Sequence, residues 1–292
     1  MHSSIAFIGF GEAAAAFADG SAQACAYDLK TDAAETRAAK LADYARHGVV
    51  GAANAAEALR EADAVLSLVT ADQALLAAQH GAGSLRAGAL WFDMNSVAPD
   101  TKRAAASAIE AAGGRYVDVA VLAPVHPQRL AVPLLVSGPH AEVGAAQLRA
   151  IGFSNVRTID GGVGKASAIK MIRSVMVKGL EALTAEWILA AEAAGIRDEA
   201  VAALNASWPG TDWEARADYN LERMMVHGLR RAAEMEEVVK TLDALGTGSA
   251  MTRGTVDRQR ALGELGQAAP DSLDDKLALL LGADTPDNKE AA

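Results

Sequence analysis

The feature that most constrains this chain is a glycine pattern close to its N-terminus. A short apolar stretch, Ile5–Ile8, leads into Gly9, Gly11 and Ala14, which have the G-x-G-x-x-A spacing. Gly9 permits a tight turn, Gly11 lets the backbone approach a pyrophosphate, and the small Ala14 lets a helix pack close to the strand. The start of such a helix offers N–H groups to a phosphate. The pattern predicts a strand–turn–helix unit that binds a dinucleotide.

An acidic residue supports the same interpretation. Asp28 ends the second expected strand, about twenty residues after the first glycine, where a carboxylate can accept hydrogen bonds from a ribose diol. A carboxylate repels a 2′-phosphate, so NAD is favoured over NADP, while Lys30 offers a phosphate contact that keeps NADP open. The alternative, a glycine turn that binds nothing, does not account for Asp28. The expected cofactor contacts are Gly9, Phe10, Gly11, Glu12, Ala13, Asp28, Lys30, Thr70, Asn95 and Ser96.

Length and charge limit the remaining classes. A chain of 292 residues can form two domains with a sizeable core. Its formal net charge of −10 argues against a nucleic-acid or anionic-membrane partner. The one cysteine, Cys25, excludes an internal disulfide, and no apolar run approaches the ~18–20 residues of a membrane span. The first strand is expected almost at Met1, which leaves no room for a signal peptide, so we expect a cytoplasmic protein. We expect no metal site.

The order of the expected elements predicts the fold class. Strands alternate with helical segments up to about residue 159, which implies a mostly parallel sheet with helices on both faces. From Lys165 to Ala194 there is no proline, and apolar residues recur at three- and four-residue spacing, so we expect one long amphipathic helix. Everything after it is expected to be helical. The prediction is an α/β Rossmann domain (1–162) and an all-α domain (163–266), joined by a long interdomain helix, then a partly disordered acidic tail (267–292).

Capping residues place some of the shorter helices. Thr31 is expected to cap a helix over 33–44, and Asn54 a helix over 55–60. Asp72 is expected to cap a helix that continues to Gln79.

Two further constellations could carry chemistry. The stretch 93–99 follows a strand at the edge where doubly wound folds bind ligands, and its Asn95 and Ser96 offer polar groups to a nicotinamide or a substrate. A plain loop before a capped helix is the alternative. Lys170 lies about two turns into the long helix, where its ammonium can protonate a developing alkoxide and its neutral amine can accept a hydroxyl proton. The alternative makes Lys165, Lys170, Arg173 and Lys178 a solvated face of the helix.

With these residues the sequence resembles the β-hydroxyacid dehydrogenase family, which includes 3-hydroxyisobutyrate and 6-phosphogluconate dehydrogenases. Gly9-Phe-Gly11 matches its cofactor loop, 93–99 matches its D-x-S-T-x-x-P stretch, and Gly162-Val-Gly164 with Lys170 matches its G-x-G…K helix. The resemblance implies a Rossmann domain plus a helical domain, and NAD(P)-dependent oxidation of a 3-hydroxy acid or the reverse reduction. It also implies that Lys170 is the general acid/base and that Ser96 contacts the nicotinamide or the substrate.

The chain departs from this family where the substrate is bound. Leu122, Ala123 and Pro124 replace the Ser-Gly-Gly that cradles a substrate carboxylate, and Ser174 replaces the Asn that follows the catalytic Lys. A stripe of Arg and His side chains near 223–231 could meet an anionic substrate instead, since Arg binds carboxylates in bidentate fashion. A salt-bridged surface is the alternative. The expected substrate contacts are Leu122, Ala123, Pro124, Ser174, Arg223, His227 and Arg231.

These observations predict an NAD(P)-dependent oxidoreductase that acts on a small, anionic hydroxy acid or its carbonyl counterpart in a cleft between the domains. An imine reductase is a second possibility. In imine reductases, however, the catalytic Lys of the dehydrogenases is typically replaced by another residue, and Lys170 is present here. A third is a cofactor-binding sensor that has lost catalysis, which the missing Ser-Gly-Gly supports. We also expect a homodimer, because a small helical domain rarely buries so long a helix alone.

Overall fold

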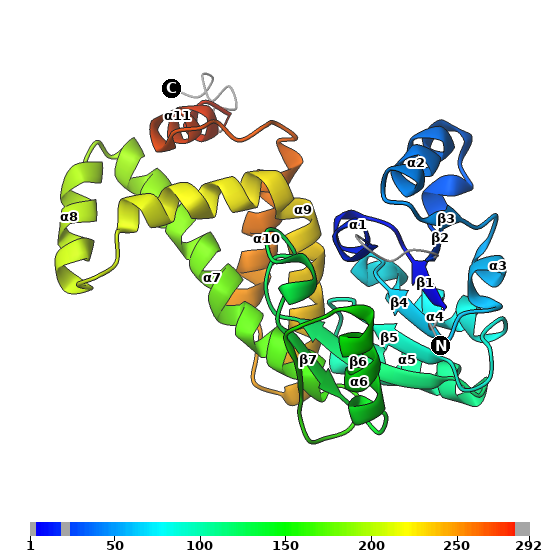
Figure 1. Cartoon of the computed structure of the whole chain (residues 1–292). Coiled ribbons are helices and arrows are strands. Elements are labelled where there is room, and N and C mark those ends of the chain that lie inside the picture. Colours follow the sequence, from blue (N-terminus) through cyan, green and yellow to red (C-terminus); the bar gives the residue numbers. More distant parts are fainter. Residues whose placement is uncertain (1–3, 19–23, 284–292) are drawn as a thin grey trace, which may run out of the picture. The chain divides into compact units, whose positions relative to one another are not determined.

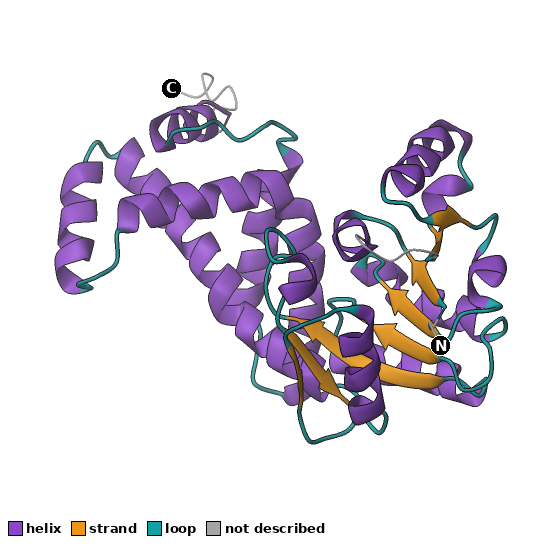
Figure 2. Ribbon diagram, in the orientation of Figure 1, coloured by secondary structure: helices purple, strands orange, loops and turns teal. Residues whose placement is uncertain are grey.

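The computed structural model describes residues 4–18 and 24–283 of the chain (Figure 1). These residues form two compact units, which divide between Ile172 and Arg173 inside one long helix. Figure 2 shows that all of the described strands belong to the N-terminal unit. The N-terminal unit is therefore α/β and the C-terminal unit helical, which confirms the predicted fold class.

One sheet organises the N-terminal unit. The strands are β1 (Ile5–Ile8), β2 (Cys25–Tyr27), β3 (Val50–Gly51), β4 (Ala64–Ser67), β5 (Leu90–Asp93), β6 (Arg115–Val121), β7 (Leu134–Ser137) and β8 (Val156–Thr158). Their order is β3-β2-β1-β4-β5-β6-β7-β8, and all neighbours run parallel except β6 and β7. The order reverses between β1 and β4, which is where doubly wound sheets bind ligands outside the carboxyl ends of their strands.

Helices cover both faces of this sheet. They are α1 (Glu12–Ala18), α2 (Ala34–Arg46), α3 (Ala55–Leu59), α4 (Ala74–Ala82), α5 (Pro99–Ala111) and α6 (Ala141–Ile151), with 3-10 turns η1 (Leu29–Thr31), η2 (Ala71–Gln73) and η3 (Arg129–Ala131). Successive strand residues point to opposite faces. Phe92 of β5 belongs to one buried cluster with Phe17 of α1 and Leu148 of α6. Its neighbour Trp91 belongs to a second cluster, with Ile109 of α5.

The helical unit is built around two long helices. Its elements are α7 (Lys165–Ala193), which begins in the N-terminal unit, α8 (Arg197–Ser207), α9 (Trp213–Leu245), α10 (Ala250–Glu264) and α11 (Leu273–Ala283). Its buried core joins Ile188 of α7, Met224 of α9, Leu262 of α10 and Leu277 of α11. Among the described residues, no helix combines the length and the apolar character that a membrane span requires.

Several local predictions can be compared with these bounds. The long helix falls where the sequence places it, and Asn54 caps α3 by accepting from the Glu57 N–H at 2.9 Å. Thr31 is not a helix cap, because η1 intervenes and Asp28 caps that turn. Asp72 likewise lies inside η2, and α4 begins only at Ala74. The expected acidic tail contains α11, and the remainder of that prediction, 284–292, lies outside the described residues.

Helices α9 and α10 pack closely against each other at two glycines, Gly228 and Gly263. A Cβ added at Gly228 would lie 2.3 Å from the Gln259 carbonyl oxygen and 2.8 Å from the Gly263 Cα. A Cβ at Gly263 would likewise lie 2.4 Å from the Leu229 nitrogen. The two backbones are therefore in direct contact, and no side chain fits between them.

We expect Gly228→Ala to destabilise the helical unit. The added methyl must push α10 away, and overpacking of this kind costs about 1–3 kcal/mol. The matched control is Gly254→Ala on α10, where an added Cβ meets nothing within 4 Å. There, the better helix propensity of alanine should raise the free energy of unfolding by about 0.5–1 kcal/mol. Urea unfolding of both variants measures the difference, and equal stability would contradict the close crossing.

Candidate active site

The glycine turn between β1 and α1 has the geometry that a dinucleotide needs. Gly9 has φ +83°, and a Cβ there would lie 2.6 Å from the Leu68 carbonyl oxygen. A Cβ at Gly11 would meet nothing within 4 Å. Gly9 is therefore required by the turn itself, while the space beside Gly11 is open at the start of α1, where Glu12 and Ala13 present the first helical N–H groups.

Both backbone polar groups of Phe10 hold the turn in place. The Phe10 N–H donates to Asp28 Oδ2 at 2.7 Å, and the Phe10 carbonyl accepts from Lys40 Nζ at 2.6 Å. The Lys40 ammonium also lies 5.9 Å from the centroid of the Phe10 ring. Asp28 accepts a second bond from the Lys30 N–H at 2.9 Å. The carboxylate that would face the adenosine ribose is thus also an anchor of the phosphate turn.

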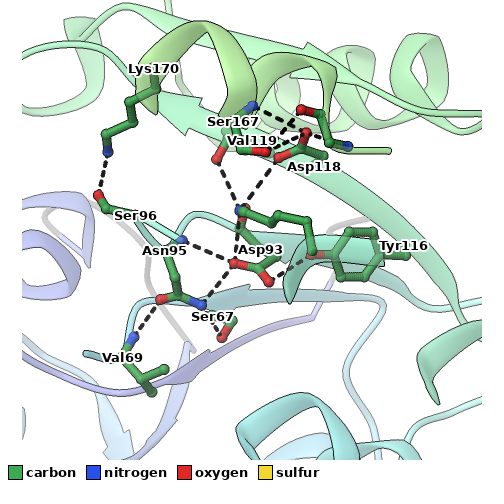
Figure 3. Close-up of polar contacts among 12 residues, drawn as sticks. Ser67, Val69, Asp93, Asn95, Ser96, Tyr116, Asp118, Val119, Ser167 and Lys170 are labelled. Carbon is green, nitrogen blue, oxygen red and sulfur yellow. Dashed lines mark hydrogen bonds and ion pairs between the residues drawn. The ribbon is translucent and has the colours of Figure 1, made fainter. Parts of the chain in front are cut away.

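A second polar loop follows β5. The Asn95 Oδ1 accepts from the Val69 N–H at 2.8 Å, and its Nδ2 donates to Ser67 Oγ at 3.1 Å (Figure 3). These bonds tie the loop after β5 to the carboxyl end of β4. Asn95 is buried, so it positions the loop, while the half-buried Ser96 next to it can reach a ligand. Thr70, the third predicted contact in this region, is exposed.

Lys170 meets this loop. Its Nζ donates to Ser96 Oγ at 2.5 Å (Figure 3). Lys170 lies on α7, in the part of that helix that belongs to the N-terminal unit. Two residues that the sequence assigns to the cofactor and to catalysis, 74 positions apart, are therefore in contact. An ammonium next to a hydroxyl can deliver a proton at this point, and the neutral amine can accept one.

The sequence interpretation missed Lys102. This side chain is fully buried, and its Nζ lies 2.6 Å from the Asp93 carbonyl oxygen, 2.9 Å from Asp93 Oδ1 and 3.4 Å from Asp118 Oδ1. Tyr116 completes the cluster by donating to Asp93 Oδ2 at 2.6 Å. Burial, together with the Asp93 and Asp118 carboxylates, raises the pKa of the Tyr116 hydroxyl well above its ordinary value, so it remains a donor. One sequence signal was present, since Lys102 is in line with the buried Ala105, Ala106 and Ile109 on α5.

The predicted substrate loop is apolar and anchored. Leu122 and Ala123 are half-buried and Pro124 is exposed. The Leu122 N–H donates to the Pro133 carbonyl at 2.9 Å, and its side chain packs against a cluster that contains Ala166 of α7. The loop therefore has no side-chain donor at the positions where the family's Ser-Gly-Gly would stand.

The predicted substrate residues of the helical unit differ in how they are placed. Ser174 is buried on α7, and Arg223 and His227 are half-buried on α9. Arg231 is buried, and its guanidinium contacts both oxygens of Glu181, with Nε to Oε2 at 3.1 Å and Nη2 to Oε1. Arg231 therefore already has the bidentate carboxylate partner that the sequence interpretation reserved for a substrate.

Lys178 is also not the solvated side chain of the alternative interpretation. It is buried and forms an ion pair with Glu234, which also pairs with Arg230. Burial lowers the pKa of the Lys178 ammonium, and the nearby Glu234 carboxylate acts in the opposite direction. Charged groups on α7 and α9 thus help to hold the helical unit together. Among the described residues, no three His, Cys, Asp or Glu side chains gather as a metal site would require.

The sheet order, the glycine turn and Asp28 define a dinucleotide-binding protein of the Rossmann type. Residues 4–151 match the NAD binding domain of 6-phosphogluconate dehydrogenase, and residues 191–262 match a domain of unknown function, DUF1932. The first match covers half of the chain, so the protein belongs to the β-hydroxyacid dehydrogenase family, as its three motifs predict. A search of curated proteins finds no match.

Solved structures share the fold over nearly the whole chain. A conserved hypothetical protein of Sinorhizobium meliloti 1021 is 38% identical, with 96% of each chain covered and a TM-score of 0.73. The 3-hydroxyisobutyrate dehydrogenase of Mycobacterium tuberculosis, solved with L-serine, is 18% identical, with 96% of this chain and 99% of that chain covered and a TM-score of 0.72. An imine reductase of Streptomyces aurantiacus is 22% identical, with 95% and 99% covered and a TM-score of 0.54. The last two similarities concern the fold alone.

Proposed function

We propose that the protein is an NAD-dependent dehydrogenase or reductase that interconverts a small hydroxy acid and its carbonyl counterpart. The observation that carries the proposal is the contact between Lys170 Nζ and Ser96 Oγ, in which Ser96 follows β5 at the same carboxyl edge of the sheet as the glycine turn after β1. The alternative roles of these residues, a solvated helix face and a plain loop, do not require this contact.

The chain's own residues would divide the work as follows. The N–H groups at the start of α1, with Glu12 and Ala13, would hold the pyrophosphate, and Asp28 would accept from the adenosine ribose. The bound nicotinamide would supply the hydride acceptor or donor. Lys170 would take the hydroxyl proton during oxidation and return it during reduction, and Ser96 would orient the Lys170 ammonium.

The substrate contacts stay predictions. The apolar Leu122–Pro124 loop offers no grip for a carboxylate, so Arg223 and His227 are the proposed partners of an anionic group. Ser174 is proposed as a further contact, one turn beyond Lys170 on α7. Because Arg231 is engaged with Glu181, its proposed role is the weakest of the four.

A titration followed by an activity panel tests this function. NADH and NADPH should bind, with NADH bound more tightly, and a panel of hydroxy acids should reduce NAD at a rate above background. The same panel extended to cyclic amines tests the imine reductase alternative, which Lys170 argues against. Binding of NADH without turnover of any compound would favour the cofactor-binding sensor.

The preference for NAD is expected to depend on Asp28. Asp28→Asn keeps an oxygen for the Phe10 N–H and removes the charge that repels a 2′-phosphate, so the NADH-over-NADPH preference should fall by about tenfold. Asp28→Ala also removes the acceptor of the Phe10 N–H, so it should weaken the binding of both cofactors. Fluorescence titration of the wild type and both variants with NADH and with NADPH measures these affinities. An unchanged preference in Asp28→Asn would show that Asp28 does not face the ribose.

A homodimer remains our proposal for the assembly. The side chains of Met176 and Leu183 on α7 are more than half exposed, with relative exposures of 64% and 57%, although they are large and apolar. Such residues favour burial against a partner. Light scattering of the purified protein would determine the assembly, and the cytoplasmic location likewise stays a prediction.

A further inference from the structure

A row of polar side chains crosses the sheet near the proposed site. Ser67, Asp93, Asp118 and Ser137 are successive register partners on the neighbouring strands β4, β5, β6 and β7. All four are at most 1% exposed. Buried carboxylates are costly unless they are paired and hydrogen-bonded. The row therefore needs a compensating cation, and Lys102 forms ion pairs with both carboxylates.

One end of this cluster holds the helix that carries Lys170. Asp118 Oδ2 accepts from the Gly164 N–H at 3.0 Å and from the Ser167 N–H at 3.3 Å, which are the N–H groups at the start of α7. Ser137 Oγ donates to the same oxygen at 3.0 Å. Lys170 follows Ser167 by about one helical turn. The position of Asp118 thus sets where the first turns of α7 begin.

The other end holds the loop that carries Ser96. Asp93 Oδ1 accepts from the Asn95 N–H at 3.0 Å and from Asn95 Nδ2 at 2.8 Å. Ser96, the next residue, receives the bond from Lys170 Nζ. The position of Asp93 thus sets where this loop leaves β5.

We propose that Lys102 is a positioning residue that holds Lys170 and Ser96 in contact. Its ammonium joins the carboxylate that anchors α7 to the carboxylate that anchors the Ser96 loop. Figure 3 labels these two carboxylates, Asp118 and Asp93. It is fully buried, so it acts through these two anchors and not on a substrate. The inference rests on the proposed role of Lys170, but its structural consequence can be measured without any substrate.

The test uses a variant that removes the bridge and keeps the charge balance. Lys102→Met leaves two buried carboxylates without their cation, so it is paired with Lys102→Met/Asp118→Asn, which restores the net charge of the cluster. Asp118→Asn alone is the control that shows how much of any change comes from the altered anchor of α7. The readout is the acetylation rate of Lys170 by acetic anhydride, measured by peptide mass spectrometry relative to the exposed Lys165 on the same helix. We expect several-fold faster labelling of Lys170 in the double variant, since its bond to Ser96 is loosened, while NADH binding persists.

Replacement of a second buried lysine is the control that distinguishes a loss of positioning from a loss of stability. Lys276 is 1% exposed and pairs with Asp218 at 2.6 Å within the helical unit. Lys276→Met should lower the melting temperature but leave the relative labelling of Lys170 unchanged. Relative labelling of Lys170 that stays at the wild-type value in a folded, NADH-binding double variant would overturn the inference.

Turnover provides the second readout. With any substrate that the wild type accepts, the double variant should lower kcat by about tenfold or more at a nearly unchanged KM, because a misplaced acid/base group affects the chemical step. A loss confined to KM would contradict positioning. Failure of the proposed function is distinguishable, since it appears as wild-type turnover in Lys170→Ala, while the labelling result stands by itself.

Discussion

Lys170→Ala should lower kcat by about 10²–10⁴-fold, because a positioned proton donor or acceptor contributes that much to a step that makes or breaks a hydroxyl group. The affinity for NADH should stay within a few-fold of the wild type, since the glycine turn and Asp28 are untouched. Ser96→Ala should have a smaller effect, because Lys170 would lose an orienting partner but keep its amine.

Lys165→Ala is the matched control for this result. Lys165 lies on the same helix and is exposed, so its removal changes the local charge by the same amount without touching Ser96. Stopped-flow or steady-state rates for the three variants would measure the series. Turnover in Lys170→Ala equal to that in Lys165→Ala would remove Lys170 from the mechanism.

The second large effect is expected at the glycine turn, where substitutions of Gly9 and Gly11 should both weaken NADH binding, but for different reasons. Gly9→Ala forces a side chain onto a backbone with φ +83° and places its Cβ 2.6 Å from the Leu68 carbonyl oxygen. The backbone strain alone costs about 1–3 kcal/mol, and the clash adds to it. This variant should lose both stability and NADH binding.

Gly11→Ala should separate these two losses. Its Cβ meets no protein atom within 4 Å, so the melting temperature should remain close to that of the wild type. The methyl group would occupy the space where the backbone is expected to approach the pyrophosphate, and the affinity for NADH should fall by about 10–100-fold. Thermal unfolding with and without NADH measures both quantities. Wild-type affinity in Gly11→Ala would show that the pyrophosphate does not lie at this turn.

The fold and the cofactor half of the site were predictable because their signals are local. The sheet follows from short apolar strands separated by helical segments, and the turn follows from the spacing of Gly9 and Gly11 alone. The contact between Ser96 and Lys170 joins residues 74 positions apart. It could be anticipated only because each residue belongs to a motif whose place in the family fold is known.

The buried charges could not be predicted in the same way. A lysine on a helix is usually solvated, and nothing near Lys102 in the sequence indicates the Asp118 partner on β6. Lys178 and Arg231 are similar cases, because their carboxylate partners are 56 and 50 residues away. The predictions that Thr31 and Asp72 cap helices were wrong for a simpler reason. A short 3-10 turn forms at each place, so the α-helix begins later in the chain.

The most direct test of the central claim is the transfer of label from NADH that is deuterated at its transferring position. The protein is incubated with this NADH and a panel of carbonyl acids and cyclic imines, and the products are analysed by mass spectrometry. The account predicts that at least one hydroxy acid gains one deuterium on the carbinol carbon, and that Lys170→Ala slows this gain by about 10²–10⁴-fold while still binding NADH. Deuterium found only in amine products, or in no product although NADH binds, would contradict a hydroxyacid dehydrogenase.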